Sequence, residues 1–483
     1  MNLKALLSHL HIAANTDKDP IITGITSHSK KVEPGYLFFA ISGVQADGHQ
    51  YIQEAFENGA AAVVGEYRET SASGLYFYAK DTKRLLSLAA SYFYDEPYKK
   101  HKMTGITGTN GKTTTSFLLQ HILVSHGIST ALFGTVHHFI NTKVVKSSHT
   151  TPDPVTLQKM LRESNDEAVV MEVSSHGLEQ NRIEGITYNQ AIFLNLTHDH
   201  LDYHGTMESY YQCKAKLFSY IKPKGTAIIC SEGSYGKRLI QELSSKNTLQ
   251  VWTYGKRKTD HFYIEDVGKN YFNLVHETMH VTVPLPLPGD YNALNTTAAI
   301  AAALDYGVPI KDSINYLNTF QGIPGRFEEL TLYNGTEVII DYAHTPDGVS
   351  QVLEAARNKA GSRPFYHVFG FRGNRDVTKR SEMISISLEY SDETVLTVDD
   401  LDGVTTEQLI QETTEAIPVG THSPTVISDR TEAIFYALRK APPKSVVIIT
   451  GKGPENYKEK YQYPSDSDLS TVKLFQSLNK AAL

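Results

Sequence analysis

The chain contains very little cysteine. Its 483 residues include two, Cys213 and Cys230. Two cysteines are too few for a disulfide framework or a zinc site, and such low usage is typical of a reducing compartment. We therefore expect a cytoplasmic protein.

Long apolar runs and a large excess of one charge are also missing. The sequence contains no run of about 20 apolar residues, which is the length that a membrane-spanning helix needs. The start MNLKALLSHLHIAAN places leucines at helical spacing, but histidines interrupt it. This pattern predicts a short amphipathic first helix rather than a signal peptide. The net charge of -7 and the pI near 6.3 give no electrostatic footprint for nucleic acid or an anionic membrane.

Short apolar runs alternate with longer stretches of helical period. The runs 36–43, 60–66, 168–174, 226–230, 337–343 and 445–453 end in small or polar residues, and stretches such as 116–127 and 296–307 follow helical spacing. The alternation predicts an α/β fold with largely parallel sheets. The length exceeds one compact core, and breaks at 95–102 and 320–330 predict three domains, residues 1–100, 101–324 and 325–483.

The stretch GITGTNGKTTT, residues 105–115, has the character of a phosphate-binding loop. Ile106 stands where a standard Walker A motif has its first glycine, and the glycines fall at 105 and 108 instead. The shifted glycines still allow the loop to bind phosphate and Mg²⁺. Gly108 and Gly111 let backbone N–H groups turn inward, Lys112 can reach the β and γ phosphates, and the Thr113 hydroxyl can ligate Mg²⁺. The following helix adds its N-terminal dipole.

Two later strands end in titratable residues. Glu172 closes the apolar run AVVME, and the run FLNLT is followed by Asp199, His200, Asp202 and His204. Ligands collect at the carboxyl ends of strands in α/β folds. Glu172 could therefore bind a magnesium ion, and the second cluster predicts a site rather than a solvated loop.

The motifs TGTNGKTT, EVSSHGLEQNR, NLTHDHLDYHG and CKAKLF together resemble those of the MurE-type Mur ligases, the UDP-N-acetylmuramoyl-tripeptide synthetases. The resemblance extends over the whole chain. It implies an N-terminal uridine-binding α/β domain, a central P-loop ATPase domain and a C-terminal Rossmann-like domain that binds the amino acid.

The resemblance also implies roles for individual residues near ATP. Thr113 and Glu172 would hold a first Mg²⁺, and His200 would help to hold a second. Lys214 matches the lysine that this family carbamylates with CO₂, although from sequence alone it is a helical surface lysine beside Lys216. The residues implied to bind ATP are Gly108, Thr109, Asn110, Gly111, Lys112, Thr113, Thr114, Asn295, Arg326, Asp341 and His344.

The remaining implied residues bind the other two substrates. The family commonly has Asp-Ser-Arg where this chain has His28-Ser29-Lys30, but Ser29 keeps its hydroxyl. For the UDP-sugar peptide the resemblance implies Ser29, Thr150, Thr151, Ser174, Gln180 and Arg182, and for the amino acid it implies Arg375, Asp399, Asp402, Gly451 and Glu455.

One position bears on which amino acid is added. The family signature Asp-Asn-Pro-Arg for meso-diaminopimelate aligns with Asp399-Asp400-Leu401-Asp402, so an aspartate replaces the arginine that pairs with the distal carboxylate. A carboxylate facing a carboxylate repels. We therefore expect a basic amino acid, L-lysine first, whose cationic tail would meet Asp402 and Glu455. The alternatives are that the loop has re-formed and Asp402 contacts no substrate, that diaminopimelate is used, or that this is a paralogue adding another amino acid.

The resemblance thus predicts an ATP-dependent ligase of peptidoglycan precursor synthesis. ATP would phosphorylate the D-glutamate carboxylate of UDP-N-acetylmuramoyl-L-alanyl-D-glutamate, and the amine of the incoming amino acid would attack the acyl phosphate. We expect a monomer. Competing interpretations are folylpolyglutamate synthase, which lacks a uridine-binding domain, a regulatory P-loop ATPase, and a catalytically dead binding protein.

Overall fold

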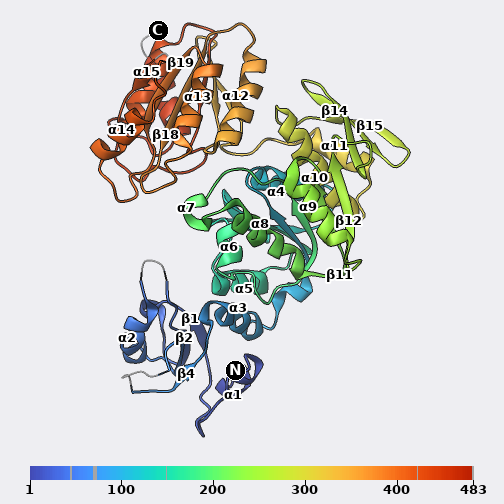
Figure 1. The fold of residues 1–483 in the computed structure, drawn as a ribbon, viewed down its shortest axis with the longest axis vertical. Helices are drawn as coiled ribbons and strands as arrows, with labels where there is room; N and C mark the ends of the chain where they lie inside the picture. Colours follow the sequence, from blue (N-terminus) through green and yellow to red (C-terminus); the bar gives the residue numbers. More distant parts are fainter. Residues whose placement is uncertain (44–45, 69–72, 148, 421–422, 481–483) are drawn as a thin grey trace.

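The protein is built on three separate β-sheets that follow one another along the chain (Figure 1). The computed structural model describes residues 1–43, 46–68, 73–147, 149–420 and 423–480. The sheets take their strands from residues 24–78, 102–284 and 328–449. In Figure 1 the N-terminal and C-terminal sheets lie at opposite ends of the long axis, with the central sheet between them. The exact limits of the three domains stay a prediction.

The N-terminal sheet is small and entirely parallel, in the order β1-β2-β3-β4. The predicted first helix is confirmed, because Leu3, Leu6 and Leu7 are fully buried against this sheet's core. The elements are β1 (Gly24–Thr26), β2 (Tyr36–Phe39), β3 (Ala62–Gly65), β4 (Tyr76–Tyr78), α1 (Leu3–His9), α2 (Ile52–Glu57) and α3 (Thr82–Phe93), with 3₁₀ turns at Ser29–Lys31, Gly48–Tyr51 and Pro97–Lys100.

The central sheet has 11 strands in the order β15-β14-β13-β12-β11-β10-β5-β9-β6-β7-β8. The inner strands from β12 to β6 are parallel, and hairpins extend both edges. The strands are β5 (Lys102–Thr107), β6 (Thr130–Phe133), β7 (His137–Ile140), β8 (Lys143–Lys146), β9 (Ala168–Glu172), β10 (Tyr188–Phe193), β11 (Ile221–Cys230), β12 (Gln250–Gly255), β13 (Phe262–Val267), β14 (Tyr271–His276) and β15 (Met279–Pro284).

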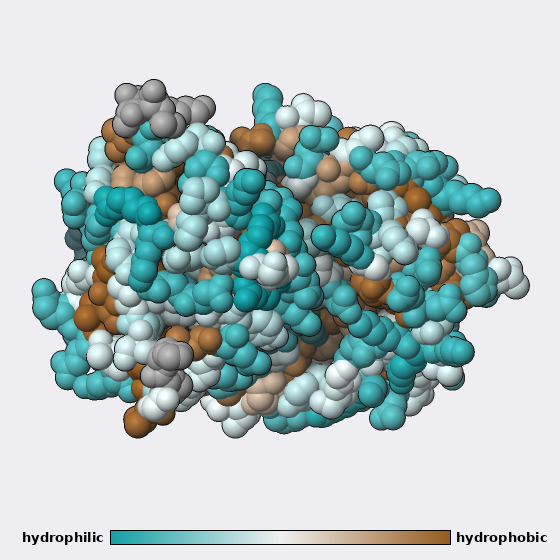
Figure 2. Space-filling model, turned by 90° about the horizontal axis from the view of Figure 1, so that it is seen from above, coloured by the Kyte–Doolittle hydropathy of each residue, from teal (hydrophilic) through white to brown (hydrophobic). Residues whose placement is uncertain are grey.

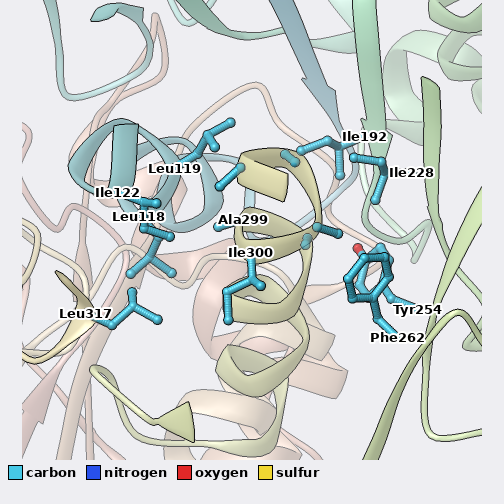
Figure 3. Close-up of a cluster of buried hydrophobic side chains, with 14 of the residues drawn as sticks. Leu118, Leu119, Ile122, Ile192, Ile228, Tyr254, Phe262, Ala299, Ile300 and Leu317 are labelled. Atoms are coloured by element: carbon cyan, nitrogen blue, oxygen red, sulfur yellow. The ribbon is translucent and has the colours of Figure 1, made fainter. Parts of the chain in front are cut away.

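Two helices pack on one face of this sheet and form its main core (Figure 3). Leu119 and Ile122 of α4 meet Ala299 and Ile300 of α10, and all four are fully buried. The alanines of α10 let the helices approach closely, which fixes the phosphate loop at the start of α4. The helices are α4 (Lys112–Ser125), α5 (Pro154–Glu163), α6 (Ser175–Glu179), α7 (Leu201–His204), α8 (Met207–Ala215), α9 (Gly233–Ser244), α10 (Asp290–Asp305) and α11 (Ile310–Leu317), with a 3₁₀ turn at Lys216–Tyr220.

The C-terminal sheet has six strands in the order β16-β17-β21-β18-β19-β20, and only its edge strand β16 is antiparallel. Helices cover both faces, giving the expected Rossmann-like layers. The elements are β16 (Glu328–Thr331), β17 (Glu337–Ile340), β18 (Phe365–Phe371), β19 (Glu393–Val398), β20 (Thr425–Val426), β21 (Val446–Ile449), α12 (Pro346–Ala360), α13 (Arg380–Tyr390), α14 (Thr406–Glu415), α15 (Arg430–Lys440) and α16 (Asp468–Lys480).

The prediction of an α/β fold is confirmed. Five of the six apolar runs contain β2, β3, β9, β17 and β21, the run 226–230 forms the second half of β11, and the two helical stretches overlap α4 and α10. The face in Figure 2 is largely hydrophilic, with apolar residues in small groups. Among the described residues, no helix combines the length and apolarity needed to cross a bilayer.

Candidate active site

A cavity of about 910 Å³ opens between the central and C-terminal sheets. Its walls come from the phosphate loop, from the ends of central strands, and from loops of the C-terminal sheet. The predicted site residues that line it are Thr109, Asn110, Gly111, Lys112, Thr113, Thr114, Thr150, Glu172, Ser174, Gln180, Arg182, Asp199, His200, Asp202, Asn295, Arg326, Asp341, His344, Arg375, Asp399 and Glu455. The structure thus brings residues that lie more than 340 positions apart in the sequence into one cavity.

The phosphate loop runs from the end of β5 to the start of α4. Gly111 has a φ of 88°, and a Cβ atom there would lie 2.3 Å from Oδ1 of Asn295, so only glycine fits. Lys112 Nζ donates to the carbonyl oxygens of Gly108 at 2.8 Å and Thr109 at 2.9 Å. Burial lowers the pKa of Lys112, and Glu172 opposes that shift. The lysine is therefore held over the loop where a nucleotide's phosphates would sit.

Glu172, at the end of β9, sits beside the loop in a ring of hydroxyl groups. Its Oε2 accepts from Thr113 Oγ1 at 3.0 Å and from Thr135 Oγ1 at 2.9 Å. Carboxylate and hydroxyl oxygens are the hard donors that Mg²⁺ prefers, and Mg²⁺ is usually held by one or two carboxylates together with substrate phosphates. The described residues contain no cluster of three or more His, Cys, Asp or Glu side chains that could cage a metal alone. This pair fits the partial site that Mg²⁺ shares with ATP.

Lys214 is not a surface residue, and that expectation from the sequence is wrong. Its side chain is 1% exposed, and Nζ donates to Gly108 O at 2.8 Å, the carbonyl that Lys112 also contacts. It packs on the Tyr210 ring, with Nζ 4.6 Å from the ring centroid. Burial and the Lys112 charge lower its pKa well below the usual value. Helical periodicity placed Lys214 at the surface because the sequence does not indicate that α8 packs beneath the phosphate loop.

The histidine-rich segment after β10 reaches the same cavity. His200 has a left-handed φ of 54°, and its Nε2 lies 3.2 Å from Asp199 Oδ2. Burial lowers the pKa of His200 to about 3 although Asp199 opposes the shift, so the ring is neutral. A neutral imidazole can bind a metal. His204 instead stacks on Tyr210, outside the cavity lining.

The residues expected for the UDP-sugar peptide fall into two groups. Thr150, Ser174, Gln180 and Arg182 line the cavity, and the two Arg182 contacts to Gln180 Oε1, at 3.1 and 2.7 Å, hold its guanidinium in place. Thr151 lies behind them and donates to the backbone oxygen of Glu172 at 2.9 Å.

Ser29 is buried in a 3₁₀ turn of the N-terminal sheet and does not line the cavity.

The residues expected near the nucleotide come from two domains. Arg326 donates to Thr113 Oγ1 at 3.1 Å and lies over the Tyr342 ring. Asp341 accepts from the backbone N–H groups of residues 327 and 343, and burial raises its pKa. His344 is neutral, because burial lowers its pKa to about 4. Asn295 of α10 faces the loop from the central domain.

The amino-acid end of the cavity is rich in ion pairs. Arg375 lines the cavity and has no hydrogen-bond or ion-pair partner among the described residues. Glu455, also in the lining, contacts Arg372 and accepts from Tyr342 Oη at 2.7 Å. Asp399 is buried against Arg430. At this end of the cavity, the Arg375 guanidinium is therefore available to bind a ligand's carboxylate.

Asp402 does not face the cavity. Its Oδ1 accepts from Lys458 Nζ at 2.8 Å, and Lys458 also lies 3.3 Å from Asp400. Gly451 lies beside Asp399, likewise outside the lining. The expectation that Asp402 meets the substrate's tail is therefore not supported, and the alternative of a re-formed loop fits this geometry.

Sequence reasoning missed several residues that shape the site. Thr135 follows β6 and supports Glu172. Asp347, at the start of α12, accepts from Asn110 Nδ2 at 2.7 Å and joins the two domains. Lys458 and Arg372 neutralise the acids of the C-terminal loops. Arg372 and Asp347 lie within a few residues of the predicted residues Arg375 and His344, whereas no sequence signal singled out Thr135 or Lys458.

Sequence profiles of three protein domains match the chain. That of the Mur ligase family catalytic domain matches residues 21–92, that of the Mur ligase middle domain residues 106–303, and that of the Mur ligase glutamate ligase domain residues 325–453. The matches together cover parts of all three sheets.

Curated proteins and solved structures are similar over nearly the full length. The UDP-N-acetylmuramoyl-L-alanyl-D-glutamate--2,6-diaminopimelate ligase of Aquifex aeolicus is 39% identical over 94% of this chain and 93% of its own. The protein of the same name from Cytophaga hutchinsonii is 35% identical over 99% and 100%. A solved structure of such a ligase matches with a TM-score of 0.69 and 28% identity over 98% of this chain and 99% of that chain. MurF of Thermotoga maritima, solved with ADP, matches with a TM-score of 0.65 at 18% identity over 95% and 98%.

Proposed function

The chain belongs to the Mur ligase family, and from that premise we propose that it is an ATP-dependent ligase of peptidoglycan precursor synthesis. It joins an amino acid to the D-glutamate carboxylate of UDP-N-acetylmuramoyl-L-alanyl-D-glutamate and releases ADP and phosphate. One observation carries the proposal. The phosphate loop, the Thr113–Glu172 pair and the unpaired Arg375 face a single cavity, so ATP, an acid and an amino acid can meet there.

The protein's part in the first step is to position charges. The loop N–H groups and Lys112 hold the phosphates, and Arg182 and Gln180 orient the acceptor's glutamate carboxylate in line with the γ-phosphorus. Mg²⁺, held through Thr113 and Glu172, would neutralise phosphate charge when bound. The carboxylate oxygen attacks phosphorus, ADP leaves, and an acyl phosphate remains.

The second step forms the amide. Arg375 holds the amino acid by its α-carboxylate, a charge-assisted pairing suited to the guanidinium fork. The amine then attacks the acyl carbon, phosphate leaves with the bonding electrons, and the nitrogen gives up one proton to the departing phosphate. The cavity's position between two domains would shield the acyl phosphate from water.

Lys214 is proposed as the carbamylated lysine. A lysine buried beside the Lys112 cation is held partly as the free amine, and the free amine is the form that attacks CO₂. Attack forms a C–N bond, the nitrogen loses a proton, and the buried side chain becomes an anion. That anion would lie beside Lys112 and help His200 to hold a second Mg²⁺.

For the amino acid, meso-diaminopimelate fits better than L-lysine. The relatives at 35–39% identity are named as diaminopimelate ligases. Asp402 and Glu455, which were expected to attract a cationic tail, are already paired with Lys458 and Arg372. A lysine tail would find those two acids occupied, so their charge no longer favours a cationic substrate.

We further propose the domain limits 1–100, 101–324 and 325–483, a cytoplasmic monomer, and a uridine contact by Ser29. The absence of a spanning helix in the described part of the chain is compatible with the location. The cysteines Cys213 and Cys230 are both free and buried, which is compatible with a reducing compartment.

The proposal is tested by phosphate release with ATP, Mg²⁺ and the UDP-dipeptide while single amino acids are added. We expect meso-diaminopimelate to stimulate release and to give a product whose mass is the sum of both substrates minus water. Stimulation by L-lysine alone would restore the first expectation. Release that needs no amino acid would instead indicate a regulatory ATPase.

A further inference from the structure

Arg375 stands on a segment that has no regular secondary structure. Residues 372–379 connect β18 to α13 through turns, and Arg375 is exposed towards the cavity. An irregular loop does not fix a long side chain by itself. Something outside the loop must therefore hold it if Arg375 is to present a substrate accurately.

Two side-chain contacts join this loop to the central domain, and both involve loop residues that follow Arg375 within four positions. Asp376 Oδ2 lies 3.1 Å from His198 Nε2, and Lys379 Nζ lies 3.5 Å from Asp199 Oδ1. Three of these four side chains are 12% exposed or less, so solvent screens the contacts less than it would at an open surface. Figure 1 shows the corresponding proximity, with α7, which follows these residues, on the side facing the C-terminal sheet.

The partners in the central domain belong to the catalytic segment itself. His198 and Asp199 immediately precede His200, and Asp199 contacts that histidine at 3.2 Å. The loop that would hold the amino acid is therefore tied to the segment that would handle the acyl phosphate. Among the described residues, no other ion pair joins these two segments.

We propose that His198, Asp199, Asp376 and Lys379 form an interdomain clamp that positions Arg375, and that the clamp couples amino-acid binding to acyl phosphate consumption. The inference rests on the proposed function, since it takes Arg375 as the residue that holds the α-carboxylate. The four are positioning residues, because they act through Arg375 and not on the reacting atoms. A displacement of about 1 Å at such a point costs reaction rate steeply.

The test is a double-mutant cycle on the pair farther from the predicted metal ligands. His198→Ala, Asp376→Ala and the double variant are compared with the wild type by the KM for the amino acid and by ADP formed per amide formed. We expect each single change to raise that KM roughly five- to tenfold and the double change to raise it no further. The KM for ATP and the KM for the UDP-dipeptide stay unchanged, and the ADP-to-amide ratio rises above one.

Two matched variants separate positioning from loop folding. Thr378→Ala removes the hydrogen bond inside the loop from Thr378 Oγ1 to Asp376 Oδ1, and it leaves the backbone N–H bond of residue 378 and the contact to His198 in place. His198→Gln keeps a side-chain donor for Asp376. We expect both to stay close to wild type in the amino-acid KM, with unchanged thermal midpoints.

The clamp is refuted if the single effects add in the double variant, if the amino-acid KM does not move, or if Thr378→Ala reproduces Asp376→Ala. These failures differ from failure of the proposed function. If only the clamp is wrong, the wild type still forms the amide, and the variants alone differ from the expected results. If the wild type forms no amide with any amino acid, the proposed function and the clamp fall together.

Discussion

The phosphate end and the amino-acid end of the cavity are held together by different kinds of contact. At the phosphate end, Lys112 is held by carbonyls of its own loop, and Thr113 meets Glu172 across the neighbouring strands β5 and β9. At the amino-acid end, side-chain ion pairs join loops far apart in sequence, as between Arg372 and Glu455, which are 83 residues apart. The first arrangement follows from local backbone geometry, whereas the second depends on which charges happen to face each other.

The largest loss of activity is expected from a substitution at the phosphate end of the cavity. Lys112→Ala removes the cation nearest the transferred phosphate, and we expect kcat to fall roughly 1000-fold, the loss seen when a preorganised charge-stabilising donor is removed. Initial rates of ADP formation measure it. Near-normal rates would mean that the loop holds the phosphates by backbone alone.

The next effect tests the buried lysine against its neighbour. Lys214→Ala should lower activity roughly 10- to 100-fold by removing support for a metal site. Lys216→Ala is the matched control, because Lys216 contacts Asn181 away from the loop, and we expect activity within about twofold of wild type.

Labelled ¹³CO₂ adds a direct readout for the same pair of variants. A carbamate ¹³C resonance should appear in the wild type and in Lys216→Ala and be missing from Lys214→Ala. A resonance that persists without Lys214 would assign the modification elsewhere.

A third change tests whether the amino-acid end depends on buried charge. Asp468 accepts two hydrogen bonds of 2.7 Å from Arg430, and both side chains are fully buried. Asp468→Asn leaves the arginine charge undercompensated, and we expect the free energy of unfolding to fall by about 3 kcal/mol. Thermal denaturation measures the loss. Glu329→Gln, which breaks a more exposed pair with Lys359, should cost about 0.5 kcal/mol, and equal costs would contradict the account.

The smallest effect is expected on the choice of amino acid, from substitutions in the Asp402–Lys458 pair. Lys458→Gln leaves Asp402 unpaired and should shift the preference, measured as a ratio of kcat/KM values, roughly tenfold from meso-diaminopimelate towards L-lysine. Asp402→Asn leaves Lys458 with Asp400 as its one remaining acidic partner, 3.3 Å away, and should shift the ratio in the opposite direction. Shifts of the same sign in both variants would show that this pair does not contribute to the choice.

The same contrast explains what the sequence could predict. Glycine, lysine and threonine at fixed spacing, and titratable residues at the ends of apolar strands, place Lys112, Glu172 and His200 without any long-range knowledge. Periodicity and length likewise predicted the α/β fold. These signals lie within one or two elements of the chain.

What failed depended on long-range packing. The burial of Lys214 arises because α8 lies beneath the phosphate loop, which helical periodicity cannot reveal. The charge at Asp402 pointed to L-lysine only while its partner was unknown. Lys458 lies 56 residues away in sequence, so the pairing that neutralises Asp402 appears only in three dimensions.

The most direct measurement follows the oxygen atoms. UDP-N-acetylmuramoyl-L-alanyl-D-glutamate labelled with ¹⁸O in the D-glutamate carboxylate is incubated with ATP, Mg²⁺ and meso-diaminopimelate, and the released phosphate is analysed by mass. If the carboxylate is the phosphoryl acceptor, each phosphate carries one ¹⁸O from the substrate. Phosphate without that label would show that water receives the phosphoryl group, and the ligase account would be wrong.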